Sequence, residues 1–255
     1  MLKNAEIRVY KDKAIERFKE VFTGFDPPKI VVVSASRRQA VRNKVLRECG
    51  LDYKEDLYGT DAEVIDGPLG KQILLYQSMM KSEKQVCHAI WHELGHILFG
   101  NEKQYGIDIE KDTSMRSGYA VFNEFIAEYI AHVVSDGEGF GIYNPSMYLQ
   151  LAFQEERTIN PYWLSRYMAI ISGDSNVSDE CVSAGAEYVK PVVWNYLTEM
   201  FKMIDEQLRK DSFWKATPTF IEELGSLYDN MFSAIFRGTS GAPGFFVFGF
   251  LNRLL

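Results

Sequence analysis

Two histidines and a glutamate lie in the middle of a strongly apolar stretch, and this combination restricts the possible folds of the chain more than any other feature. His92, Glu93 and His96 have the spacing His-Glu-x-x-His. The stretch opens with Ser82-Glu83-Lys84-Gln85, a helix-capping pattern, and Gly100 supplies a stop signal. Nearly every residue between these ends is apolar, which is typical of a buried helix. Buried imidazoles and carboxylates need partners, so the fold has to supply them.

The spacing of the two histidines indicates that the partner is a metal ion. Residues four apart on a helix lie on one face, roughly 6 Å apart, so the imidazoles of His92 and His96 can bind one cation. Catalytic zinc sites use three protein ligands and leave the fourth tetrahedral position to water. Glu93 lies beside His92 and is placed to act as a base on that water. We therefore expect a zinc site with a third ligand further along the chain.

A second apolar segment carries acidic residues at a helical spacing. Glu124 and Glu128 are four residues apart, so both would line one side of a helix. The surrounding residues 121–134 give this helix a broad apolar face, and Ser135-Asp136-Gly137 is expected to close it. An ordinary charged helix face is the alternative interpretation of this spacing.

The two segments together resemble the zincin metallopeptidases, and Asn-Glu-x-x-x-acid resembles their gluzincin branch. The resemblance covers residues 82–135. It implies that His92, His96 and Glu124 bind zinc and that Glu93 is the catalytic base. Glu128 would accept a proton from the outward nitrogen of a ligand histidine, which fixes the tautomer of that ring.

Three more polar residues are expected around these ligands, namely Asn123, His88 and His132. His132 is an alternative to Glu124 as third ligand, because it lies two turns further along the same helix face. A buried histidine is more commonly satisfied by a carbonyl group, so His132 and His88 are interpreted as neighbours of the site.

The sequence can be compared with two narrower groups of zincins, and it resembles only one of them. The metzincin branch is excluded, because Phe99 and Glu102 occupy the positions of its glycine and its last histidine. The run His-Glu-Leu-Gly-His-Ile-Leu-Phe-Gly is also similar to the ImmA/IrrE-type cytosolic peptidases, which cleave transcriptional regulators.

The composition describes a globular chain that is expected to stay in the cytoplasm. Its 255 residues are 46% hydrophobic, and no apolar run has the length of a membrane span or the form of a signal-peptide core. Cys49, Cys87 and Cys181 are odd in number and widely spaced, which argues against a disulfide framework and a cysteine zinc site. A net charge of -7 disfavours nonspecific binding to nucleic acid.

One basic segment is an exception to this acidic balance. A strand is expected at residues 30–33, followed by a helix at residues 34–47 that carries Arg37, Arg38 and Arg42. A regulator that grips DNA phosphates through these arginines is one alternative function. Acidic residues follow closely and no aromatic residues interleave the arginines, so a solvated helix face is favoured.

A small sheet is expected to pack on the His-Glu-x-x-His helix, as in zincin N-terminal subdomains. Residues 62–65 and 72–77 predict two short strands joined by the turn residues 66–70. In that family an edge strand holds an extended peptide above the metal, and residues 72–77 are the candidate, with a plain core strand as the alternative. The polar segment 101–117 is expected to be a loop.

Helices predominate after Gly137, at residues 145–156, 161–171, 180–210 and 218–236, and Pro191 is expected to divide the third. The sequence therefore predicts an α+β fold. A zincin-like metal-binding part, residues 1–137, carries the small sheet, and a mainly helical part follows at residues 138–255. The two parts can form one continuous domain.

The function implied by the resemblance is hydrolysis of peptide bonds in a protein or peptide substrate. Zinc would activate water and Glu93 would act as general base. The additional donor for the oxyanion would be a tyrosine or arginine, because no histidine follows His132. The candidates are Tyr143, Tyr148, Arg157, Tyr162, Arg166 and Tyr167. The alternative is a noncatalytic regulatory or protein-binding module that keeps zinc to brace its two ligand helices.

Overall fold

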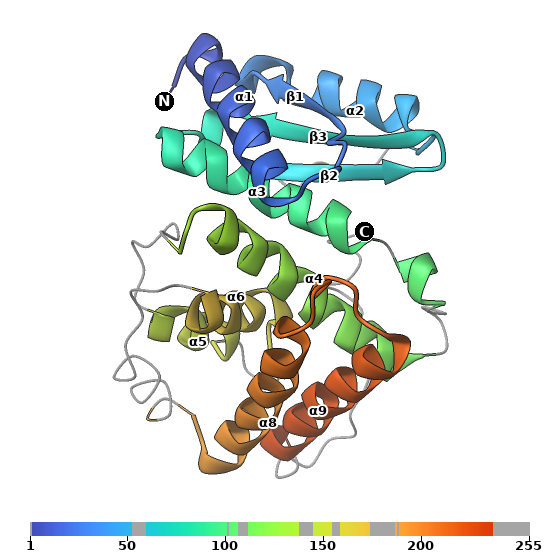
Figure 1. Ribbon diagram of the computed structural model, residues 1–255, viewed down its shortest axis with the longest axis vertical. Helices are drawn as coiled ribbons and strands as arrows, with labels where there is room; N and C mark the ends of the chain where they lie inside the picture. The colour runs from blue at the N-terminus through green and yellow to red at the C-terminus, as the bar shows by residue number, and fades with distance from the viewer. Residues whose placement is uncertain are drawn as a thin grey trace.

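The computed structural model describes residues 2–52, 60–100, 102–106, 112–137, 145–154, 159–173, 187 and 189–236. Within these residues the chain has a three-stranded sheet flanked by helices, followed by a group of packed helices (Figure 1). The predicted α+β class is confirmed. No helix in the described ranges is long and apolar enough to cross a membrane.

The first part of the chain builds the sheet and the helices on its two faces. The elements are α1 (Asn4–Val21), β1 (Lys29–Val33), a 3-10 helix (Ala35–Arg37), α2 (Arg38–Glu48), β2 (Ala62–Gly67), β3 (Gly70–Tyr76) and α3 (Glu83–Phe99). The strand order is β1-β3-β2, with β1 parallel and β2 antiparallel to β3. Leu74 and Tyr76 of β3 pack towards α2, whereas Ile73 and Leu75 pack into the core shared with α1 and α3. The sheet therefore lies between two helical layers.

The prediction that residues 72–77 form the edge strand is wrong. β3 is the central strand, because its continuous apolar run is buried on both faces. The edge strands are β1 and β2, and β2 is the one that lies next to Glu93. The N–H of Tyr76 donates to Asp61 O at 3.0 Å, so by the antiparallel alternation the outward backbone groups of β2 belong to Ala62, Val64 and Asp66.

Helix α3 begins and ends where the sequence predicts. The Ser82 hydroxyl accepts from the N–H of Gln85 at 3.2 Å, and Gly100 ends the helix with a φ of 98°. The reciprocal bond differs from the expected box, since Gln85 Oε1 accepts from the N–H of Lys81 at 3.0 Å. The chain thus places α3 directly between the sheet and α4 (Figure 1).

Helix α4 spans Thr113–Val134, so the end of the predicted 101–117 loop is helical. A second short helix, Glu102–Tyr105, lies in the same segment. The early start of α4 has a tertiary cause. Gly118 and Gly225 allow α4 and α9 (Pro218–Phe236) to cross in backbone contact, where a Cβ on Gly225 would meet Ser114 O at 1.7 Å.

Each described helix of the later part begins with a proline, whose fixed φ suits the first helical position. These helices are α5 (Pro145–Ala152), α6 (Pro161–Gly173), α8 (Pro191–Leu208) and α9. The predicted division at Pro191 matches the start of α8, while residues 180–186 lie outside the described residues. The predicted boundary between the metal-binding part and the helical part lies at residues 137/138. Residues 138–144 lie outside the described residues, so this boundary stays a prediction.

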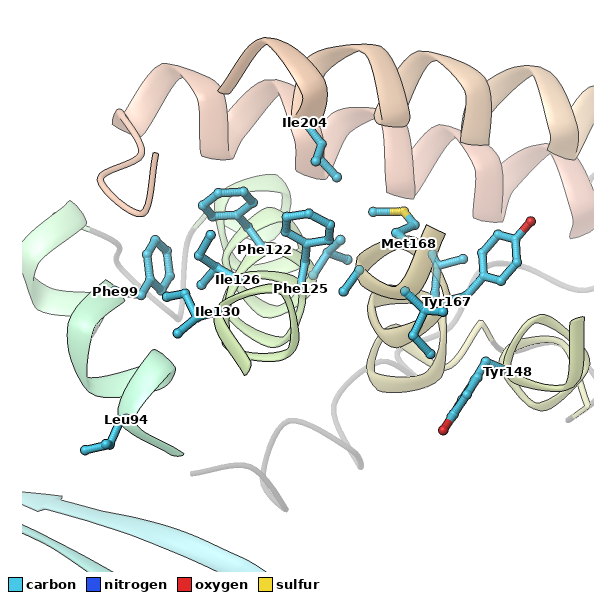
Figure 2. Close-up of a cluster of buried hydrophobic side chains, with 14 of the residues drawn as sticks. Leu94, Phe99, Phe122, Phe125, Ile126, Ile130, Tyr148, Tyr167, Met168 and Ile204 are labelled. Atoms are coloured by element: carbon cyan, nitrogen blue, oxygen red, sulfur yellow. The ribbon is translucent and has the colours of Figure 1, made fainter. Parts of the chain in front are cut away.

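One hydrophobic core joins both parts of the chain, and α4 lies at its centre. Figure 2 shows Phe122 and Phe125 of α4 between Phe99 of α3 and Met168 of α6, with Ile204 of α8 above them in this view. All of these side chains are at most 3% exposed. The helix that carries Glu124 and Glu128 is therefore held rigidly from several directions.

The expectation of a solvated helix face is wrong for Arg38 and Arg42 of α2. Arg42 Nε donates to Glu63 Oε1 at 2.8 Å, and the Arg38 guanidinium lies 3.5 Å from the ring centroid of Tyr76. Both arginines are buried, whereas Arg37 is exposed. Arg38 and Arg42 fasten α2 to the sheet, and a DNA-binding surface made of all three arginines has no basis in this geometry.

Candidate metal centre

All four histidines of the chain gather where α3 crosses α4. His88, His92 and His96 follow one another at four-residue spacing on α3, and His132 comes from α4. Their rings are neighbours, with centroid distances of 4.7 Å between His92 and His96 and 6.1 Å between His88 and His132. A chain with so few histidines has thus concentrated them in one buried region.

The crossing is close because both helices carry a small residue at the contact. A Cβ built on Gly95 would lie 2.7 Å from the Cα of Ala127, which is closer than real Cβ atoms approach. His92 and His96 flank Gly95 at the same offsets at which Glu124 and Glu128 flank Ala127. The backbone contact therefore brings the histidine face of α3 against the acidic face of α4.

His92, His96 and Glu124 converge on one point. His92 Nε2 lies 3.1 Å from His96 Nε2, and the Glu124 carboxylate oxygens lie 3.7 Å from His92 Nε2 and 3.8 Å from His96 Nε2. Three ligands at about 2.0 Å from a tetrahedral zinc ion are separated by about 3.3 Å from one another. The spacing of the three side chains fits that requirement without rearrangement.

The opposite nitrogens of the two rings have acceptors of their own. His92 Nδ1 lies 3.0 Å from Glu128 Oε2, and His96 Nδ1 lies 3.0 Å from Asn123 Oδ1. Both partners are acceptors as oriented here, so each Nδ1 carries the proton and each Nε2 presents a lone pair. Two lone pairs and a carboxylate thus face one another, an arrangement that a cation would satisfy.

Burial sets the protonation of two of these three groups, His92 and Glu124. Burial lowers the pKa of His92 to about 3, so its imidazole is neutral, the form that binds metals. Burial also raises the pKa of Glu124, partly offset by His96 and Arg166. Glu124 is 4% exposed, and its Oε2 has no hydrogen-bond partner among the described residues. A bound divalent cation would supply that partner.

Glu93 lies beside these ligands on the side of α3 that faces β2. Burial raises its pKa to about 7, and the negative charges of Glu124 and Glu63 act in the same direction, while His96 opposes them. The outward N–H of Val64 also interacts with this carboxylate and favours its charged form. Glu93 thus lies between the candidate metal position and the β2 edge of the sheet.

Glu128 is the centre of a second set of contacts. Its Oε2 accepts from His92 and from Arg166 Nε and Nη2 at 3.1 and 2.9 Å, and its Oε1 lies 3.1 Å from His88 Nε2. Burial alone would raise the pKa of Glu128, but Arg166 and the histidines hold it well below its usual value. His88, His92 and Glu128 are also close enough to share an ion. The guanidinium on Glu128 already neutralises it, so we place no second cation there.

The remaining predicted neighbours are accounted for by this arrangement. Asn123 orients His96, and His88 contacts Glu128. His132 Nε2 lies 3.7 Å from Glu128 Oε1, so His132 is a neighbour of Glu128 and belongs to neither of the groups that could hold an ion. The structure thus places Glu124, rather than His132, opposite the two histidines of the motif.

The structure also separates the candidates for an oxyanion donor. The Tyr162 hydroxyl accepts from Arg166 Nη1 at 2.5 Å. Burial raises the pKa of Tyr162 against the effect of Arg166, and the charges of Glu124 and Glu93 raise it further, so the hydroxyl keeps its proton next to the site. Tyr167 is fully buried beside Phe201, and Tyr148 packs on Trp163. Tyr143 and Arg157 lie outside the described residues.

Sequence reasoning gave Arg166 only as a candidate oxyanion donor and missed its contact with Glu128, although one signal for that contact was visible. Arg166 is the single charged residue of α6, whose other members are mostly apolar. A lone charge on a buried helix requires a buried partner of opposite sign. Gly95 and the backbone of Val64 were also missed, because backbone positions carry no chemical signature in a motif.

Comparisons of the chain with protein families, with curated proteins and with solved structures gave no match. The geometry described above therefore has to support any functional conclusion by itself.

Proposed function

We propose that the chain is a zinc-dependent metallopeptidase of the gluzincin type, in which His92, His96 and Glu124 hold the metal. The observation that carries the proposal is the convergence of two imidazole Nε2 atoms and an unpartnered carboxylate oxygen on one point. Glu93 supports a catalytic role for the site, because a purely structural zinc site has no need of a base beside its ligand.

Zinc held by these residues would polarise a scissile carbonyl and make a water molecule more acidic. Glu93 takes a proton from the attacking water and delivers it to the leaving amine. The Tyr162 hydroxyl accepts a hydrogen bond from Arg166 and keeps its own hydrogen available, so it can donate to the oxyanion. Glu93 therefore transfers the proton, and Tyr162 stabilises the negative charge of the oxyanion.

The substrate of this reaction would be a peptide segment in an extended conformation. The outward N–H and C=O of Ala62 and the outward C=O of Val64 on β2 are suited to pair with such a segment, as an added strand does at a sheet edge. Val64 lies next to Glu93, so a peptide bound there would have its backbone near the base. Folded proteins would need a flexible segment to enter this position.

The first test is the zinc content of the full chain, purified without chelators or a histidine tag. We expect about one zinc per chain, lost or sharply weakened in His92→Ala and in Glu124→Ala. Zinc retained in Glu124→Ala would transfer the third ligand to Glu128 or His132. A correctly folded wild-type chain that binds no added zinc would contradict the proposal.

The second test is hydrolysis of an unfolded protein or of a peptide library by the zinc-loaded chain. Glu93→Gln should retain zinc and lower kcat by at least about 10²-fold, because it removes the base but keeps the shape. Glu83→Gln is the matched control, since Glu83 is an exposed residue in the first turn of the same helix. Equal activity in wild type and Glu93→Gln would disprove the catalytic role, and zinc without any activity would favour a noncatalytic module.

A further inference from the structure

Arg166 connects the later part of the chain to the candidate metal centre, although all three ligands lie on α3 and α4. Its Nε and Nη2 donate to Glu128 Oε2 at 3.1 and 2.9 Å. The same oxygen accepts from His92 Nδ1 at 3.0 Å. The guanidinium of α6 is therefore two hydrogen bonds away from a ligand imidazole.

The geometry makes the orientation of His92 depend on Arg166. Glu128 is 3% exposed, and rotation of its carboxylate would turn Oε2 away from His92. Two parallel N–H donors from one planar group hold a carboxylate oxygen in place better than a single donor does. A charged acceptor on Nδ1 in turn fixes the ring, keeps Nε2 unprotonated and raises its basicity as a ligand.

The same guanidinium also holds the Tyr162 hydroxyl through Nη1, at 2.5 Å. One side chain thus sets the position of His92, through Glu128, relative to that of Tyr162. Lysine cannot replace it, because a single ammonium group does not offer three N–H directions in one plane.

We propose that Arg166 is a positioning residue that tunes the metal affinity of the His92–His96–Glu124 site through Glu128. This inference rests on the proposed zinc site and adds that α6 contributes to metal binding. Thermodynamic linkage requires the converse as well, so metal binding should strengthen the docking of α6 on α4.

The structure allows this role to be separated from simple packing of α6. Leu164, Tyr167 and Met168 of α6 are fully buried, so the helix is docked mainly by apolar contacts. Ser165, next to Arg166, donates from Oγ to Val121 O at 2.8 Å. This second polar bond between α6 and α4 does not involve Glu128, which makes Ser165→Ala a matched control.

The experiment measures the zinc dissociation constant of the full chain by competition with a chromophoric chelator. Arg166→Met should weaken zinc binding about 10- to 100-fold, the usual effect of losing a group that orients a ligand. Arg166→Lys should bind zinc with an affinity between those of Arg166→Met and wild type, because lysine keeps the positive charge but lacks the planar set of N–H donors. Ser165→Ala should lower thermal stability and leave zinc affinity unchanged.

Cobalt(II) provides a second readout in the same proteins. Its visible absorption should change in Arg166→Met and Arg166→Lys, since the orientation of His92 changes, and should match wild type in Ser165→Ala. Folded Arg166 variants that bind zinc as tightly as wild type would overturn the inference while leaving the proposed zinc site intact. If Arg166→Met does not fold, Arg166→Lys provides the decisive measurement. A wild-type chain that binds no zinc would overturn both.

Discussion

Gly95 is the residue on which the geometry of the site depends most directly without contacting a ligand itself. Its missing side chain allows α3 and α4 to touch through their backbones, with Ala127 opposite. The two histidines and the two glutamates reach one another because they lie within one turn of this contact. A position inside the motif that carries no functional group thus controls the ligand distances.

Gly95→Ala should push the two helices apart. Alanine gains about 1 kcal/mol in helix propensity over glycine. The added Cβ would meet backbone atoms of Ala127, which cannot rotate away, and overpacking of this kind costs about 1–3 kcal/mol. We expect a net loss of stability in urea denaturation of the metal-free protein and a weaker zinc affinity. Unchanged values of both quantities would show that the crossing tolerates separation.

Arg38 and Arg42 show at the same scale how residue type can mislead. Both belong to a helix whose basic composition indicates exposure, yet both are buried against Tyr76 and Glu63. An arginine can bury its charge when a carboxylate or an aromatic face is fixed nearby. Sequence shows the arginine but not the sheet that lies beneath it.

At the scale of elements, β2 combines a structural and a proposed functional role. Its inward backbone groups pair with β3, and the backbone groups of Ala62, Val64 and Asp66 point away from β3. A proline removes the backbone N–H at its own position. Proline substitution can therefore distinguish an N–H that pairs with β3 from an N–H that points away from it.

Ala62→Pro should be tolerated, because proline is accepted at the first residue of an edge strand when its N–H faces outward. We expect a change in unfolding free energy within about 1 kcal/mol of wild type. Peptide hydrolysis should show a raised KM, with zinc content unchanged. A wild-type KM would argue against substrate pairing along β2.

Glu63→Pro is the inward counterpart, since Glu63 faces Leu74 in a hydrogen-bonded pair. It should destabilise the chain more than Glu63→Ala does. Both changes remove the contact with Arg42, but only proline also removes a ladder hydrogen bond. Equal losses in the two variants would show that the assigned direction of the backbone groups is wrong.

At the scale of the whole molecule, the candidate metal site adjoins a large hydrophobic core. The main hydrophobic cluster includes residues from α1, the sheet, α3, α4, α6, α8 and α9. Such a core can hold the chain together without an ion, unlike a small zinc finger. The site is therefore preformed, and metal binding should add stability without creating the fold.

Removal of zinc by a chelator should leave a folded protein that melts at a lower temperature. Free zinc at a thousand times the dissociation constant adds about 4 kcal/mol to the folded state. For a chain of this size each kcal/mol shifts the melting temperature by about 2–4 °C, so we expect a difference of about 10 °C in scanning calorimetry. His92→Ala should show no such difference. Identical melting of the wild type with and without zinc would contradict binding at this site.

The local signals were sufficient to predict the two helices of the site. Ser82 and Gly100 delimit α3, and the four-residue spacings place His92 with His96 and Glu124 with Glu128 on common faces. These features depend on interactions within a few residues, so they can be read from the sequence alone.

The tertiary structure was needed for everything that joins one element to another. It made β3 the central strand, turned Arg38 and Arg42 inward, and set Arg166 of α6 on Glu128. Each of these outcomes depends on which apolar surfaces are buried against each other, and residues far apart in sequence meet through that packing. The sequence by itself determined the chemistry available at the site. The distance between its groups was decided by a backbone contact between Gly95 and Ala127, which no pattern of residue types reveals.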